Sequence, residues 1–200
     1  MRYFLSVLSL LILTNFGWGQ DKPSLYQQYY NSGTQWIKGA NYKNAIVSFD
    51  LALKEASVAD AYFLRAFAKM KLDLYQEAII DFDSALVLEP EKLEILHQKS
   101  QAQALMGNHQ EALSVLDQAF KIDKNNSYTH YYQGLIHMQW QRYQTAFRSL
   151  QKAVKIKPNF AMALIYRGLC SNNLGRIQSA LNDYNKALKI DSSLALGYQY

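Results

Sequence analysis

The chain has 200 residues, half of them hydrophobic, and a formal net charge of +5. Only three prolines and nine glycines are present, which leaves few places for long loops. One cysteine excludes an intramolecular disulfide, so a disulfide-stapled scaffold is ruled out and a continuous apolar core must hold the fold.

The first nineteen residues have the features of an export signal. An apolar run over residues 3–16 follows a basic start, and it is too short to span a bilayer comfortably. Gly17 and Gly19 are the small residues that a signal peptidase needs, so we expect cleavage before Gln20. The protein is then exported to the periplasm of a bacterial envelope or secreted. The alternative is an uncleaved membrane anchor.

After a linker at residues 20–25, in which Ser24 is a candidate helix cap, one pattern recurs along the chain. Its most regular feature is an alanine with a fixed spacing, at Ala45, Ala78, Ala112, Ala146 and Ala180. A large residue follows four positions later, namely Phe49, Phe82, Leu116, Leu150 and Tyr184. Each period also has a small residue further upstream of its alanine, in the preceding helix, at Gly33, Ala66, Ser100, Gly134 and Gly168. A period near 34 residues predicts a helical repeat array.

Each period is expected to hold two helices joined by a short turn, as at residues 106–108 and 174–176. Pro90 and Pro158 close two of the repeats. The predicted array covers residues 26–194, divided as 26–58, 59–92, 93–126, 127–160 and 161–194. Residues 195–200 are interpreted as a partial repeat or a tail.

In this pattern the chain resembles the tetratricopeptide repeat family. The resemblance implies an all-α fold, a right-handed α-solenoid of about five helix-turn-helix repeats. It also implies a non-catalytic protein–protein interaction module, a scaffold or adaptor that holds a peptide or protein segment in a concave groove. The identity of that partner is open.

The resemblance further implies that three residues from the first helix of each repeat line the groove. The candidate lining residues are Tyr30, Phe63, Phe67, Met70, His97, Gln101, Tyr131, Leu135, Met138, Ile165 and Leu169, joined by Thr34, Ile37, Ala104 and Asn172. One branch of the family clamps a peptide carboxylate with lysine, arginine and asparagine at the first two places of each trio. This chain has none of these residues there, so we expect an apolar groove. The alternative is that these side chains only contact one another.

Close helix crossing is expected where small residues face each other. Gly134 is predicted to face Ala146, and Gly168 to face Ala180, which allows the backbones to approach. The large residue of each repeat is then expected to fill the space toward the next one.

No arrangement of reactive residues indicates an enzyme. His130 and His137 are seven residues apart on one helix, about 10 Å along its axis, and cannot share a metal ion. Cys170 is expected to be a buried, inert thiol. We therefore expect no catalytic residue, no cofactor and no metal site. An accessory domain whose partner carries the catalysis stays open.

Charge is distributed unevenly along the chain. Residues 20–120 hold 9 basic and 13 acidic residues, whereas residues 121–200 hold 11 basic and 3 acidic ones. Arg148, Lys152 and Lys155 fall on one helix face and form a predicted basic stripe. An alternative function is binding of an envelope surface, a glycan or anionic lipid through this half, and a merely solvated face is equally open. No nucleic-acid partner is expected for an exported protein.

The last repeat lacks an obvious polar cap. Its exposed apolar face, predicted at Leu181, Tyr184, Leu188 and Tyr198, is a candidate surface for self-association or for a partner.

Overall fold

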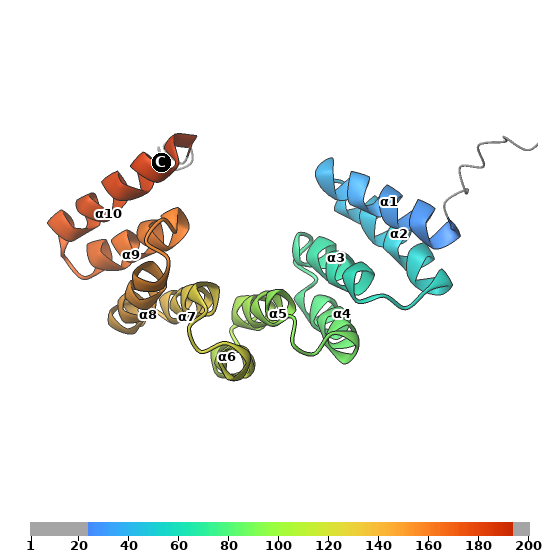
Figure 1. Cartoon of the computed structure of the whole chain (residues 1–200), viewed down its shortest axis with the longest axis horizontal. Coiled ribbons are helices and arrows are strands. Elements are labelled where there is room, and N and C mark those ends of the chain that lie inside the picture. The colour runs from blue at the N-terminus through green and yellow to red at the C-terminus, as the bar shows by residue number, and fades with distance from the viewer. Residues whose placement is uncertain (1–23, 194–200) are drawn as a thin grey trace, which may run out of the picture.

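The computed structural model describes residues 24–193, which form ten α-helices and contain no strand (Figure 1). The helices are α1 (Leu25–Lys38), α2 (Tyr42–Glu55), α3 (Ala59–Met70), α4 (Tyr75–Leu88), α5 (Leu93–Leu105), α6 (His109–Ile122), α7 (Ser127–Gln139), α8 (Tyr143–Ile156), α9 (Ala161–Asn173) and α10 (Ile177–Ile190). This confirms the predicted all-α repeat fold. The predicted signal segment, its cleavage before Gln20 and the tail at 195–200 lie outside the described residues.

The helices pair in chain order and the pairs follow one another along an open arc (Figure 1). Helices α3, α5, α7 and α9 face the inside of the arc, whereas α4, α6 and α8 lie on its outside. Each helix contacts mainly its neighbours in sequence, as expected for a repeat array. Within residues 24–193, no helix is both long enough and apolar enough to cross a membrane.

Local sequence signals set the helix ends. The Ser24 hydroxyl accepts a hydrogen bond from the Gln27 backbone N–H at 3.2 Å, which confirms the predicted cap of α1. Inside each helix pair one residue has a left-handed backbone, with φ between 54° and 84°, at Ala40, Asp73, Gly107, Gln141 and Gly175. These positions share the period of the array. Each closes the first helix and turns the chain back, although only two of them are glycine.

The small residue of each first helix makes room for the large residue of the second. A Cβ atom added at Gly134 would come within 2.5 Å of Leu150 Cγ, and one at Gly168 within 2.6 Å of Tyr184 Cε1. The nearest neighbour of each glycine is therefore the large residue of the second helix, and not the alanine that we predicted. The large side chain lies directly over the glycine because the missing Cβ atom leaves space for it.

Leu150 also belongs to a buried cluster with Ala163 and Cys170 of the next repeat, so it contributes to packing both within and between repeats. Ala146 and Leu150 are both fully buried. The Cys170 thiol is buried too, as predicted, and its pKa is raised to about 12 by desolvation.

A second set of contacts between helices is ionic. Asp81 on α4 accepts hydrogen bonds from Arg65 Nη2 at 2.6 Å and Arg65 Nε at 2.8 Å. Lys69 lies 2.8 Å from the same carboxylate, and Arg65 also reaches Asp50 of the preceding repeat at 2.6 Å. Asp81 is only 2 % exposed, and this fork of cations supplies the ion pairs that a buried carboxylate needs.

The fifth helix pair repeats the arrangement at Arg167 and Asp183, with nitrogen–oxygen distances of 2.8 and 2.5 Å. Asp83, two residues after Asp81, points the other way and pairs with Lys99 of α5. The two aspartates thus serve different contacts, one inside a repeat and one between repeats.

Candidate functional site

Two surfaces are candidates for binding: the inside of the arc, where the predicted groove residues lie on first helices, and the outer basic stripe on α8. The predicted groove residues differ in how much of their side-chain surface is exposed to solvent. On α3, Phe63 and Met70 pack partly against the cluster around Phe82, and the Phe63 and Phe82 ring centroids are 5.9 Å apart. Phe67 is half-buried, and the Lys71 ammonium lies 5.2 Å from its ring centroid. Helix α3 thus retains partly exposed apolar surface.

Helix α5 differs from this expectation. His97 is 5 % exposed, and its Nε2 is hydrogen-bonded to the Thr129 hydroxyl of α7 at 2.8 Å. Its ring also stacks on Tyr132, with 4.9 Å between centroids, while Gln98 donates to the Tyr132 hydroxyl at 2.9 Å. Predicting His97 as a groove contact was wrong, because it joins two repeats from within. Gln101 stays half-buried, and Ala104 is buried as well.

This polar junction between α5 and α7 was not found from the sequence. Desolvation lowers the pKa of His97 to about 4. Burial, together with Glu94 and Tyr128, raises the pKa of Tyr132 to about 12. Both groups are therefore neutral near pH 7, and they act as a stacked and hydrogen-bonded pair rather than as charges.

Helix α7 carries the densest aromatic contacts of the inner side. The Tyr131 ring centroid lies 4.9 Å from Phe160, 5.4 Å from Tyr132 and 5.8 Å from Tyr166. Met138 packs against the same cluster, and Leu135 is half-buried. Part of each of these side chains faces solvent, and the rest stabilises the step from α7 to α9.

At the two ends of the predicted lining, the side chains mostly pack against other residues of the chain. On α1, Tyr30 is half-buried, with its ring centroid 5.9 Å from that of Phe49. On α9, Ile165 is 4 % exposed and lies in a cluster with Ala187, against which Leu169 also packs. Placing Ile165 on the groove surface was therefore wrong, since its side chain is used to hold α9 against the last helix.

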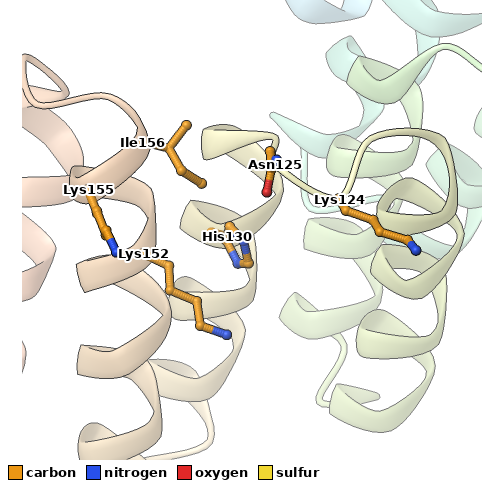
Figure 2. Close-up of a pocket in the computed structure, with 6 residues that line it drawn as sticks. All are labelled: Lys124, Asn125, His130, Lys152, Lys155 and Ile156. Atoms are coloured by element: carbon orange, nitrogen blue, oxygen red, sulfur yellow. The ribbon is translucent and has the colours of Figure 1, made fainter.

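On the outer side, Arg148, Lys152 and Lys155 are exposed on α8, as the stripe prediction required. Lys152 and Lys155 also line a hollow of about 600 Å³, which Arg148 does not (Figure 2). We call it the basic hollow; it is lined by Lys124, Asn125, His130, Lys152, Lys155 and Ile156. Lys124 and Asn125 come from the loop before α7, and His130 comes from its first turns.

The inclusion of Lys124 and His130 was missed from the sequence. A signal was present in the repeats one period away, where other residue types stand at these positions. Pro90 and Pro158 correspond to Lys124, and Leu96 and Leu164 correspond to His130.

The terminal helix presents apolar side chains to solvent. Leu181 is 48 % exposed and Leu188 is 38 % exposed, and Ile177 adds to the same helix. Tyr184 packs against Gly168 and is half-buried, so it is less available for another protein than predicted. Tyr198 lies outside the described residues, and self-association through this face stays a prediction.

Reactive side chains are not gathered on either surface. Across residues 24–193, no three histidine, cysteine, aspartate or glutamate side chains are arranged to hold a metal ion. Two half-buried histidines contact aromatic rings: His109 lies 5.3 Å from Trp140, and His130 lies 4.8 Å from Phe120, between ring centroids.

The buried His97 predicts a pH-dependent stability. Its pKa falls from 6.5 to about 4 on folding, so the unfolded chain binds more protons between these values. The free energy of unfolding should therefore be highest above about pH 6.5 and decrease as the pH falls toward 4. Between about pH 7 and pH 5 we expect the native sequence to lose about 2 kcal/mol more than His97→Gln.

Urea unfolding at the two pH values measures this difference. The pKa values of His130 and His137 are also lowered by desolvation, and they titrate alike in both proteins. Equal losses in the two proteins would show that His97 is not the neutral buried group described above.

The comparisons with known proteins agree with this architecture. The tetratricopeptide repeat family matches residues 59–92, 93–126, 129–160 and 163–194, more than half of the chain. Sperm-associated antigen 1 of Mus musculus is 34% identical over 89 residues, which are 44% of this chain and 10% of that protein. Suppressor of RPS4-RLD 1 of Arabidopsis thaliana is 39% identical over 82 residues, 40% of this chain and 8% of that protein. The chain thus spans about a tenth of these relatives.

Solved structures show the same fold at low sequence identity. A thermophilic tetratricopeptide repeat protein of Thermus thermophilus superposes with a TM-score of 0.74 at 24% identity, covering 86% of this chain and 96% of that one. MamA of Desulfovibrio magneticus gives 0.66 at 18% identity, covering 86% and 97%. A tetratricopeptide repeat protein of Parabacteroides merdae gives 0.73 at 18% identity, covering 84% and 66%. With the repeat period, the helix pairs and the family match in agreement, the chain belongs to the tetratricopeptide repeat family.

Proposed function

We propose that this chain is a non-catalytic scaffold or adaptor that binds an apolar segment of a partner protein on the inside of its arc. Tetratricopeptide repeats in general mediate protein–protein interaction. The observation that carries the proposal is the set of partly exposed apolar side chains on α3 and α7. They are Phe63, Phe67, Met70, Tyr131, Leu135 and Met138.

These side chains form two patches rather than one continuous lining. Helix α5 lies between α3 and α7, and of its three predicted lining residues His97 and Ala104 are buried, which leaves the half-buried Gln101. A partner segment would therefore place apolar side chains at two places, with its backbone near the amide of Gln101. Aromatic anchors of this kind dominate binding energy when they enter a pocket or groove.

A peptide-display selection on the purified protein, followed by affinity measurement on the selected peptides, tests this. Phe67→Ala and Leu135→Ala should each weaken binding by roughly tenfold or more, because truncating an anchor costs about 2 kcal/mol. Both residues are half-buried and outside the buried clusters, so the fold should survive. Tyr131 is a poorer choice, because its contacts with Phe160 and Tyr166 also hold two repeats together.

The matched control is Ile80→Ala, which truncates an exposed apolar side chain on the outer helix α4. It should leave the affinity unchanged. The alternative predicts the opposite results. In it, an envelope surface, glycan or anionic lipid binds through Arg148, Lys152 and Lys155. Binding would then weaken steeply with salt and with Arg148→Glu plus Lys152→Glu, while Phe67→Ala would have no effect. That result would replace the inner-surface proposal.

A further inference from the structure

The basic hollow on the outside of the arc is specific to one repeat. All repeats share the same helix pair, so equivalent positions can be compared at steps of 34 residues. His130 stands where Tyr62, Leu96 and Leu164 stand in three other repeats, and Leu96 and Leu164 are 2% exposed core residues. Lys124 stands where Pro90 and Pro158 stand. The backbone that the repeats share therefore does not explain why His130 and Lys124 occur in this one repeat.

His130 is incompletely satisfied by the protein. Its Nδ1 atom is buried and makes no hydrogen bond of standard geometry with residues 24–193. Desolvation and the nearby Lys152 charge lower the pKa of His130, and the Gln133 side chain and the Lys124 backbone offset this in part. This neutral imidazole lies at the edge of an open hollow and has one nitrogen without a partner of standard geometry, so a turn of the ring would let it bond a group from outside.

The lysines of the hollow are unpaired as well. Lys124, Lys152 and Lys155 form no salt bridge with the described part of the chain, whereas Lys69, Lys92 and Lys99 of the first half all do. The hollow has no carboxylate in its lining. The adjacent Asp123 is engaged by its own turn, accepting from the Asn125 backbone N–H at 2.9 Å and the Asn126 side chain at 3.3 Å.

Cations gathered around one hollow repel one another, and an anion bound between them removes that repulsion. We propose that the basic hollow binds a phosphate group, with Lys124, Lys152 and Lys155 neutralising its charge and His130 forming a hydrogen bond to it. Lysine binds phosphate as a point charge, whereas a planar carboxylate is better matched by the fork of arginine, which the lining lacks. Ile156 and the volume of about 600 Å³ leave room for the apolar or polar body that carries the phosphate.

The first experiment is a titration of the purified protein with inorganic phosphate at constant ionic strength, followed by NMR. The backbone signals of Lys124 and Asn125 and the ring signals of His130 should shift together and saturate. If these signals do not move, or if all lysine-rich surfaces shift alike, the proposal is wrong.

The second experiment uses paired variants. Lys152→Gln with Lys155→Gln should weaken phosphate binding by roughly tenfold or more, because two charge-assisted contacts are lost. The control is Lys186→Gln with Lys189→Gln, which removes the same charge from the same register positions of α10, where both lysines are exposed. Equal weakening in the two proteins would overturn the site in favour of a general charge effect.

His130→Leu tests the hydrogen bond separately. Leucine stands at this register position in two other repeats, so the variant should keep the fold, and circular dichroism checks this. Binding should fall while the protein charge at neutral pH stays the same. Unchanged phosphate affinity would remove His130 from the site.

A last arm separates the two sources of the phosphate. Vesicles of phosphatidylcholine with and without phosphatidylglycerol are sedimented with the protein. Capture by the anionic vesicles that is lost in the hollow variant and kept in the α10 control assigns the site to a lipid headgroup. Phosphate binding without vesicle capture assigns it to a soluble phosphate ester. Either result is independent of the inner-surface variants, so this proposal and the peptide proposal can fail separately.

Discussion

Replacing Asp81 by alanine is expected to lower the free energy of unfolding by about 3–5 kcal/mol, because it leaves buried cations without their partner. Asp81 holds both Arg65 and Lys69, whose side chains are 17% and 13% exposed. Without the carboxylate, Lys69 keeps no ion pair among the described residues, and Arg65 keeps only Asp50. Urea unfolding followed by circular dichroism measures the loss.

The matched control is Asp83→Ala, two residues further along the same helix. The Asp83 side chain is 53% exposed and pairs with Lys99 across a repeat junction. A solvated pair of this kind contributes about 0–1 kcal/mol, so the control should unfold close to the native sequence. If both variants lose the same amount, the buried fork between α3 and α4 contributes no more than a surface ion pair.

The glycine–leucine contact of the fourth repeat predicts a second large effect. Leu150→Ala should cost about 2–5 kcal/mol, because the side chain is fully buried and leaves a cavity. Gly134→Ala should cost about 1–3 kcal/mol, since the new methyl group would overlap Leu150. The double variant should be more stable than the sum of the two losses implies, because the methyl group introduced by Gly134→Ala enters the space that Leu150 has left.

Phe82→Ala provides the comparison for that cycle, since it truncates the same register position two repeats earlier. Combined with Gly134→Ala, its effect should be additive, because the two residues are in separate parts of the core. Additive losses for Gly134→Ala with Leu150→Ala would mean that these residues do not share a contact.

The sequence predicted the parts of the fold that depend on local pattern. The alanine spacing, the large residue four positions later and the turns at 106–108 and 174–176 were sufficient to predict helix pairs in tandem. Local geometry explains this success. A helix is recognised by the period of its apolar residues and by its caps, and an array repeats these signals many times. The exposure of the stripe at Lys152 and Lys155 followed from the same periodicity.

The site depended on contacts between repeats, which the period of one repeat does not contain. His97 and Ile165 occupy the same register position as Phe63 and Tyr131, yet they are buried and the other two are only half-buried. The difference comes from the neighbours. Thr129 and Tyr132 of α7 offer His97 a hydrogen bond and a stacking surface, and Ala187 of α10 leaves room for Ile165.

The sequence by itself therefore determined the number and order of helices, the turn positions and the outward face of α8, because these follow from residues within one helix pair. Only the tertiary structure decided which large residue covers each glycine, which aspartate is buried, and that Lys124 and His130 join Lys152 and Lys155 around one hollow. Those features arise where a loop and two helices of neighbouring repeats meet. Their geometry depends on the angle between repeats, which is set by the packed side chains together and not by any single stretch of sequence.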